Sequence, residues 1–259
     1  MAQERYISFL DMLGFSKVVM DSDLDELIRR INGALINVPF AETLGEFVHE
    51  NGKLVPNRQK RKCICFSFSD TFVLSSPDTS PDSLNNILIA TYLLTRGLFA
   101  YGFPVRGAIA KGEADYIPNT QHLVGKAVIT AAQLEKQQDW FGIALSPEVL
   151  PDEESIRLLK QSTLPILVHY PVPVKGGSTV RLYVINWRLN MTVVKGTKSM
   201  FPPPYNEETQ RKFDNTLAFA KYLRDTGQAY MRLPEPWQQG LYVSDTDPTL
   251  VPPAHGDEY

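Results

Sequence analysis

The order in which strand-like and helix-like repeats follow one another constrains this fold more than any other feature of the sequence. Apolar residues at every second position are typical of half-buried strands, whereas a spacing of three or four is typical of helices. In chain order the sequence predicts a strand over 5–12, a helix over 24–35, two strands over 63–76 that turn at Asp70, a helix over 80–102 and a strand over 104–114. This order, β-α-β-β-α-β, predicts a ferredoxin-like α+β fold in which helices cover one face of an antiparallel sheet.

Further elements are predicted towards the C-terminus. Gly125 precedes a helical pattern with the sequence KAVITAAQLEKQQ, and FGIALS is typical of a strand. PILVHYPVPV and TVRLYVINW flank the turn KGGS, which predicts a hairpin. We therefore expect a main domain over 1–190 and a C-terminal extension over 191–259. The extension should contain one helix and an irregular segment rich in proline and aspartate.

Composition and charge narrow the class of protein. The 259 residues carry a formal net charge of −3, which provides no general attraction for nucleic acid. The basic run at 58–62 reads as a solvated loop before a strand. No apolar run reaches the ~20 residues that a membrane helix needs, and residues 1–9 lack the composition of a leader. We expect a cytoplasmic protein with no membrane or nucleic-acid partner, in which Cys63 and Cys65 stay reduced.

Two acidic residues stand where strands are predicted to end. Asp11 closes the first strand, and Asp70 occupies the turn of the later strand pair. These strand ends can lie side by side in the predicted sheet, and two adjacent carboxylates raise each other's pKa unless a cation lies between them. Carboxylate oxygens suit Mg²⁺ or Mn²⁺. The alternative interpretation is that each Asp only ends a strand or caps a helix.

Five segments of the chain resemble motifs of the class III nucleotidyl cyclases, in the same order. They are FLDMLGFS at 9–16, FSFSDTFVLSS at 66–76, PVRGAIAKGEA at 104–114, VGKAVITAAQLE at 124–135 and VKGGSTVRLYVINW at 174–187. The first two resemble the family's metal-binding Asp segments, with Ser69 where glycine is usual. The others resemble its Arg-containing strand, its Gly-led helix and its closing Lys-Gly hairpin.

This resemblance implies that 1–190 is a catalytic domain that works as a homodimer, with composite active sites at the seam between subunits. Asp11, Met12 and Asp70 would hold two divalent ions, Mn²⁺ or Mg²⁺. The residues that would bind phosphate are Leu13, Gly14, Phe15, Ser16 and the catalytic Arg106. The 3′-hydroxyl of a nucleoside triphosphate would attack its own α-phosphorus and expel pyrophosphate.

The departures from the family pattern concern the base and the transition state. Phe66 stands where purine cyclases have a base-reading Lys, and His122 where they have an Asp or a similar residue. Phe66 can stack on a base but forms no hydrogen bond in its plane, so His122 is the candidate for reading the base edge. Ile129 and Gln133 replace a helix Asn and Arg of the family. The cations left to face the substrate phosphates are Arg106, Lys111 and Lys175.

Each of these residues also has an ordinary structural interpretation. Arg106 can face solvent from its strand, His122 can be a loop residue, and Phe66 can be a core aromatic. Gln133 can lie on the polar face of its helix, and Lys175 can be a hairpin turn residue.

A compact cyclase with these exchanges resembles the pyrimidine cyclases of the bacterial Pycsar anti-phage system. The resemblance implies conversion of UTP to cyclic UMP, or of CTP to cyclic CMP, and a separate effector that the cyclic nucleotide activates. We favour UTP, although no residue decides between the two bases. Two other interpretations stay open: a cyclase-like module that binds nucleotide without turnover, and a purine cyclase with an unusual base pocket.

Overall fold

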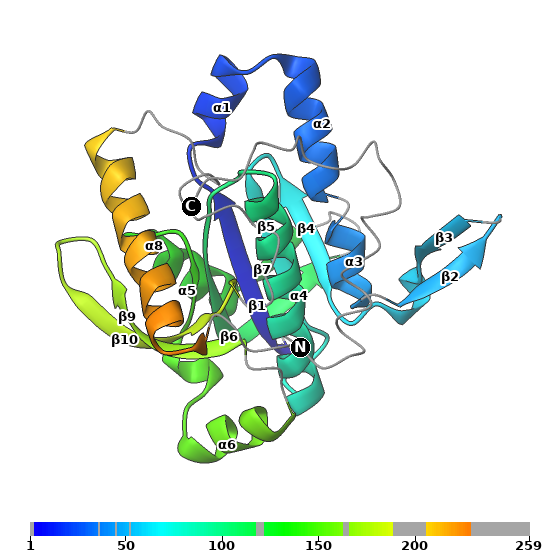
Figure 1. Ribbon diagram of the computed structural model, residues 1–259. Helices are drawn as coiled ribbons and strands as arrows, with labels where there is room; N and C mark the ends of the chain where they lie inside the picture. Colours follow the sequence, from blue (N-terminus) through cyan, green and yellow to red (C-terminus); the bar gives the residue numbers. More distant parts are fainter. Residues whose placement is uncertain are drawn as a thin grey trace.

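An antiparallel-rich sheet organises the part of the chain that this computed structural model describes (Figure 1). The described residues are 3–35, 37–44, 46–51, 53–117, 122–162, 166–188 and 206–228. In spatial order the strands are β4 (Ile64–Phe68), β5 (Thr71–Ser75), β1 (Gln3–Met12), β6 (Val105–Ile117), β8 (Ile143–Leu145), β10 (Thr179–Ile185) and β9 (Leu167–Pro173). The pairs β4–β5, β5–β1 and β1–β6 are antiparallel, which is the ferredoxin-like order. The predicted α+β class is confirmed.

Three strands were not expected from the sequence as they occur here. β7 (His122–Gly125) pairs with the end of β6, outside the order given above. β2 (Phe47–Glu50) and β3 (Lys53–Pro56) form a separate hairpin that projects away from the main sheet (Figure 1). These strands are four residues long, and half-buried alternation is too brief in them to predict a strand rather than a loop.

The helices lie in connections between strands, except α8, which follows the last described strand. They are α1 (Phe15–Asp21), α2 (Leu24–Leu35), α3 (Asn37–Thr43), α4 (Pro81–Ala100), α5 (Lys126–Gln137), α6 (Glu153–Ser162) and α8 (Glu207–Asp225), with short 3₁₀ turns at Arg58–Lys60 and Pro147–Val149. α4 begins as its sequence predicts, because Ser80 Oγ accepts a hydrogen bond of 3.2 Å from the Ser83 N–H. Within the described residues, no helix is long and apolar enough to cross a bilayer.

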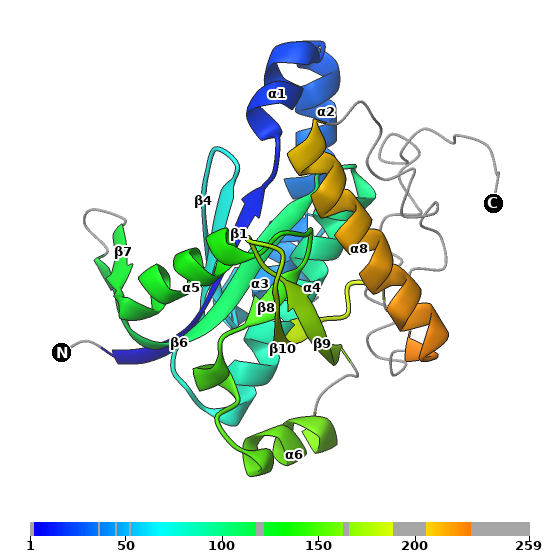
Figure 2. The same cartoon turned by 90° about the vertical axis from the view of Figure 1, so that its left-hand side faces the viewer.

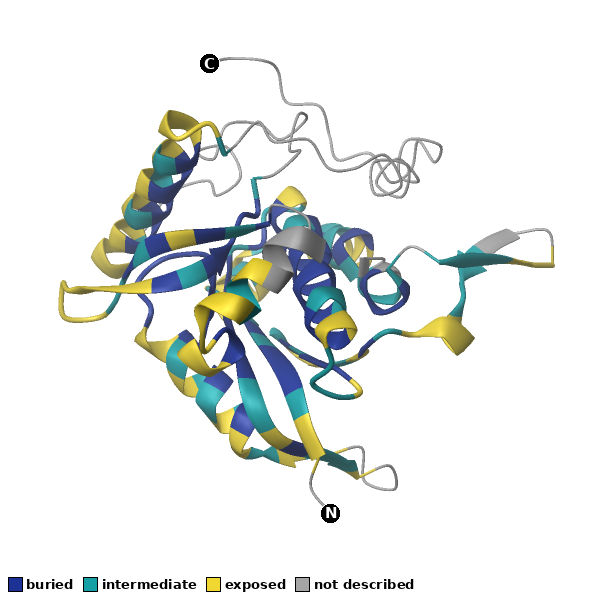
Figure 3. Cartoon of the chain, turned by 90° about the horizontal axis from the view of Figure 1, so that it is seen from below, coloured by how far each residue is buried: buried dark blue, intermediate teal, exposed yellow. Residues whose placement is uncertain are grey.

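Helices cover both faces of the sheet rather than one (Figure 2). Because side chains alternate along a strand, Leu10 and Met12 of β1 enter the larger core that α4 also lines, whereas Ile7 points to the opposite face. There α5 packs Ala127 and Ala131 against Ile7, and these small side chains let the helix lie close to the strands. The prediction of helices on one face missed α5, which follows the β-α-β-β-α-β unit in the chain. Buried residues are concentrated in the sheet and in α4 (Figure 3).

The start of β4 is held by a buried carboxylate. Glu42 of α3 is only 5% exposed, accepts a hydrogen bond of 2.8 Å from the Cys65 N–H and pairs with Arg61 at 3.2 Å. Part of the predicted solvated basic loop is therefore bonded to the protein. Cys63 and Cys65 are free thiols, as expected, and burial raises the pKa of Cys63 to about 12.

The helix predicted in the C-terminal extension exists and belongs to the same core as the sheet. Phe219 of α8 is fully buried, and its ring meets Trp140 edge-on at a centroid distance of 4.9 Å. The hydroxyl of Thr216 accepts a hydrogen bond of 2.8 Å from the Phe141 N–H. The rest of the predicted extension lies outside the described residues.

Phe219→Ala is expected to lower the free energy of unfolding by about 3–5 kcal/mol, because it leaves a cavity in this core. Urea denaturation followed by tryptophan fluorescence measures the change. Phe68→Ala is the matched control, since the Phe68 side chain is 86% exposed; its effect should stay within about 0.5 kcal/mol. Equal effects of the two substitutions would show that α8 is not part of the core.

Candidate metal and nucleotide site

The strand pairing brings Asp11 and Asp70 to the same end of the sheet. In the β1–β5 register Asp11 stands opposite Thr71, the residue that follows Asp70. The Met12 N–H donates a hydrogen bond of 2.9 Å to the Asp70 carbonyl, which fastens the β4–β5 turn to the end of β1. The Thr71 hydroxyl donates to Asp11 Oδ1 at 3.3 Å and orients this carboxylate. The two acids are therefore neighbours in space although they are far apart in the chain.

The environment of Asp11 disfavours its charged form. The pKa of the Asp11 carboxyl is raised to about 6, first by burial and then by the negative charges of Glu135 and Asp70. The Thr71 hydrogen bond and the charge of Arg106 lower it by smaller amounts. A cation between Asp11 and Asp70 would remove this penalty.

The oxygen atoms present fit a divalent ion of the magnesium type. Two carboxylates, with phosphates and waters completing the shell, are the ligand set that Mg²⁺ takes at phosphoryl-transfer sites. Met12 could add only its main-chain oxygen, because its side chain is 4% exposed within the core. Among the described residues no group of three His, Cys, Asp or Glu side chains gathers.

The turn that carries Asp70 is strained. Ser69 has a φ of 55°, in the left-handed region, which costs a residue with a side chain roughly 1–2 kcal/mol. Glycine would adopt this backbone without that cost, which accounts for glycine at this place in the motif that the segment resembles. The strain lies next to a candidate ligand rather than in the core.

The segment predicted to bind phosphate is only partly available. The Leu13 N–H donates a hydrogen bond of 2.8 Å to the Pro104 carbonyl, so the prediction that this amide faces phosphate is wrong for the structure described. Gly14 has a φ of 72° and is followed by α1, whose first residues are Phe15 and Ser16. Their amides are at the open end of a helix that has no buried residue.

Arg106 lies directly opposite Asp11 in the β1–β6 register but does not point freely into the site. It is 6% exposed. Its Nε donates to Glu135 Oε1 at 2.6 Å, and its Nη1 donates to the Gln138 carbonyl at 3.1 Å. The motif resemblance implied a phosphate ligand here, but Arg106 forms a buried ion pair with Glu135 of α5.

Glu135 and Gln138 are the residues that the sequence analysis missed. The Gln138 side-chain amide donates to the Gly107 carbonyl at 2.7 Å and accepts from Trp140 Nε1 at 2.7 Å, which ties the end of α5 to the sheet. A signal for Glu135 was present: it follows Ala131 by four positions, and this spacing places it on the buried stripe of the helix.

The two residues assigned to the base, Phe66 and His122, lie on different hairpins of the sheet. Phe66 stands opposite Val73, and Val73 stands opposite Phe9, two positions before Asp11 in β1. Phe66 and Asp11 therefore lie on the same face of the sheet. Its ring packs against Tyr116 at a centroid distance of 5.0 Å, a contact that was not predicted. His122 is exposed and pairs with Ile117 in the β6–β7 hairpin.

Gln133 lies on the outer side of α5. Both Gln133 and Ile129 are exposed, whereas Ala127, Ala131 and Glu135 form the buried side of the helix. Within one subunit, α5 therefore directs Gln133 away from Asp11. A role for Gln133 in a nucleotide site needs a second subunit.

The two candidate lysines do not accompany Arg106. Lys111 is five positions along β6, about 17 Å at the rise of a strand, and lies 3.9 Å from Glu4. Lys175 is exposed in the β9–β10 turn, and its main-chain N–H donates to the Gln137 carbonyl at 2.8 Å. The pKa of Glu208 in α8 is lowered mainly by Lys212, and the charge of Lys175 adds a smaller effect.

No family model and no curated protein matches the chain. Similar solved structures include the guanylate cyclase domain of RhGC from Catenaria anguillulae in complex with GTP, with 14% identity, a TM-score of 0.47 and coverage of 71% of this chain and 96% of that one. The catalytic core of a rhodopsin-guanylyl cyclase with converted specificity, in complex with ATPαS, is 14% identical, with a TM-score of 0.46 and coverage of 71% of this chain and 96% of that one. A bacterial light-regulated adenylyl cyclase is 13% identical, with a TM-score of 0.45 and coverage of 72% of this chain and 92% of that one.

The raised pKa of Asp11 predicts a pH-dependent stability in the absence of divalent cations. The folded protein holds this proton to a higher pH than the unfolded chain, whose Asp pKa is ~3.9, so it binds more protons between the two values. The free energy of unfolding should therefore fall as the pH rises from about 4 to about 6. Asp11→Asn should lack this fall and be the more stable protein at neutral pH.

Thermal unfolding in EDTA across this pH range measures the difference. Asp152→Asn is a control of opposite sign, because the Ser155 N–H lowers the pKa of Asp152, and that contribution to stability appears as the pH rises. Equal stability of Asp11→Asn and the wild type at neutral pH would contradict the prediction.

Proposed function

We propose that this protein is a metal-dependent nucleotide cyclase that converts UTP, in preference to CTP, to its 3′,5′-cyclic monophosphate and pyrophosphate. The observation that carries the proposal is the meeting of Asp11 and Asp70 at one strand end, fixed by the 2.9 Å hydrogen bond from Met12 N–H to the Asp70 carbonyl. The five segments that resemble class III cyclases supply the reaction class.

The reaction needs positioning and charge neutralisation rather than a nucleophilic side chain. The bond between O3′ and the α-phosphorus forms while the bond from that phosphorus to the bridging oxygen breaks; pyrophosphate leaves, and the hydroxyl proton passes to water. Divalent ions, Mn²⁺ or Mg²⁺, would neutralise phosphate oxygens as this happens. Asp11 and Asp70 would hold them, and Thr71 keeps Asp11 oriented through its hydroxyl.

The choice of a pyrimidine rests on the residues available to the base. Phe66 offers a ring face and no hydrogen bond, and Tyr116 lies against it. Phe66 thus stands in place of the Lys that reads a purine in the class III cyclases, and Tyr116 packs against its ring. His122, exposed on the β6–β7 hairpin, remains the proposed reader of the base edge.

We further propose a homodimer and a role in anti-phage signalling. The exposed outer side of α5, with Gln133 and Ile129, is where a second subunit would complete the site. The cyclic nucleotide would act on a separate effector, as the resemblance to the Pycsar cyclases implies.

A binding module without turnover is the second candidate. Ile129 and Gln133 carry no charge with which to stabilise a transition state, and this favours it. The retention of two neighbouring carboxylates, one with a pKa raised to about 6, argues for a working cation site instead. The third interpretation, a purine cyclase, is distinguished by the assay described next.

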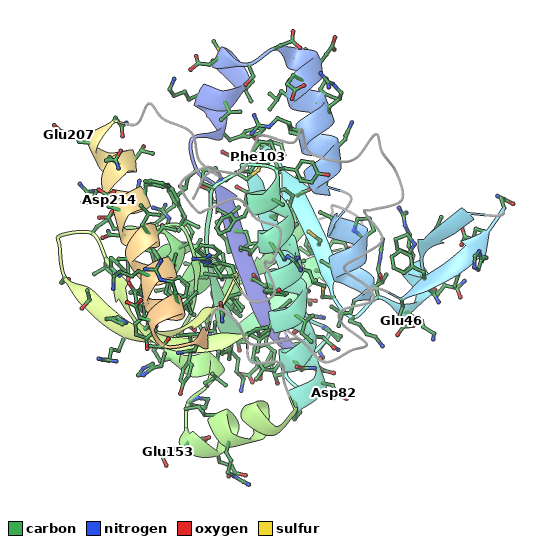
Figure 4. All side chains as sticks on the ribbon, viewed as in Figure 1. Glu46, Asp82, Phe103, Glu153, Glu207 and Asp214 are labelled. Atoms are coloured by element: carbon green, nitrogen blue, oxygen red, sulfur yellow. The ribbon has the colours of Figure 1, made fainter. Side chains whose placement is uncertain are left out.

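Purified protein incubated with Mn²⁺ and each ribonucleoside triphosphate should form cyclic UMP, and less cyclic CMP, detected by chromatography. Product from ATP or GTP alone would identify a purine cyclase, and bound nucleotide without product would identify the binding module. Asp70→Asn should reduce turnover by at least about 10³-fold, because a metal ion supplies several kcal/mol of charge stabilisation. Asp82→Asn, in the first turn of α4 (Figure 4), is the matched control and should retain activity.

A composite site predicts complementation between two inactive variants. Asp11→Ala removes the proposed metal ligand, and His122→Ala removes the proposed base reader from the partner's side of the same site. Mixed dimers of the two variants contain one site that lacks both groups and one intact site. Turnover of the purified heterodimer should recover to about half of the wild-type value, and an inactive heterodimer would contradict shared sites.

A further inference from the structure

A buried ion pair lies beside the candidate cation site and is not used by the proposed reaction. The side chains of Arg106 and Glu135 are 7% and 2% exposed, with Nη2 of Arg106 at 2.5 Å from Oε1 of Glu135. Nε of Arg106 donates to the same oxygen, and Nη1 donates to the Gln138 carbonyl. All three guanidinium nitrogens therefore have partners within the chain.

The pair stands next to Asp11. Arg106 is the direct cross-strand neighbour of Asp11. The Glu135 carboxylate extends from α5 to pair with Arg106 at this end of the sheet. The two charges act on Asp11 in opposite directions, and the charge of Glu135 acts more strongly than that of Arg106. If Arg106 turned to a phosphate, Glu135 would be left as an unpaired buried charge, which is strongly destabilising.

We propose that Arg106 and Glu135 are positioning residues: as a neutral pair they keep the charge beside Asp11 low enough for a divalent cation to bind, and Arg106 stays bonded to Glu135 instead of binding the substrate phosphates. This inference rests on the proposed function of the Asp11–Asp70 site. It replaces the phosphate-binding role that the resemblance implied for Arg106.

Mn²⁺ binding without nucleotide, measured by electron paramagnetic resonance of the free ion, tests the charge balance. Glu135→Gln keeps the shape of the side chain but leaves the Arg106 charge unbalanced, so Mn²⁺ affinity should fall about tenfold, the equivalent of one pKa unit. Arg106→Gln should raise the affinity by a smaller factor, because the charge of Arg106 acts on Asp11 less strongly than that of Glu135. The double variant should therefore bind Mn²⁺ more tightly than Glu135→Gln and less tightly than Arg106→Gln.

The control is Glu113→Gln, which removes the same charge from an exposed residue of β6 that pairs with Lys126; its Mn²⁺ affinity should match the wild type. A purely structural role for the pair would change thermal stability but could not produce effects of opposite sign on Mn²⁺ affinity that partly cancel in the double variant. If Arg106→Gln does not fold, Glu135→Gln and the double variant still decide the outcome.

A second measurement separates the two roles of Arg106. Binding of inorganic triphosphate at saturating Mn²⁺ should be unchanged in the double variant, and a loss of about tenfold or more would show that Arg106 binds phosphate and overturn the proposal. Unchanged Mn²⁺ affinity in Glu135→Gln would also overturn it. Failure of the wild type to bind Mn²⁺ at all would instead refute the cation site and with it the proposed function.

Discussion

The antiparallel pairing of β1 with β5 is the interaction on which the candidate site depends. It sets Asp11 opposite Thr71 and lets the Met12 N–H hold the Asp70 carbonyl. A slip of one residue would turn Asp11 into the core that Leu10 and Met12 now fill. The same apolar side chains that fix the register for packing therefore fix the position of the carboxylate, and the geometry of the site follows from the burial of one strand face.

Much of the fold was predictable because alternation and caps are local signals. The two strands that turn at Asp70 and the helix capped by Ser80 occur where the sequence indicated. The position of α5 was not predictable in this way, since periodicity shows which residues share a helix side but not which face of a sheet the helix will cover. Ala127 and Ala131 decide this by allowing close packing against Ile7, a contact between distant segments.

The parts of the site that depend only on residue type and on position in a strand were predictable. Asp11 and Asp70 could be paired from topology alone. The partners of Arg106 could not, because its ion pair with Glu135 joins β6 to α5 and depends on the depth at which both side chains are buried. The Leu13 amide illustrates the same limit: its hydrogen bond to Pro104 comes from a neighbouring segment, and no motif indicates it.

Three unfavourable features coincide at this end of the sheet: a desolvated carboxylate at Asp11, a second acid at Asp70, and left-handed backbone at Ser69. Stability alone gives no reason for them to gather, because each would be relieved by a common substitution. The divalent cation that we propose would offset the first two, and the turn at Ser69 would present Asp70 to it. Local cost concentrated at one point on an otherwise well-packed sheet is what the proposed cation site would explain, and this argument does not depend on any family likeness.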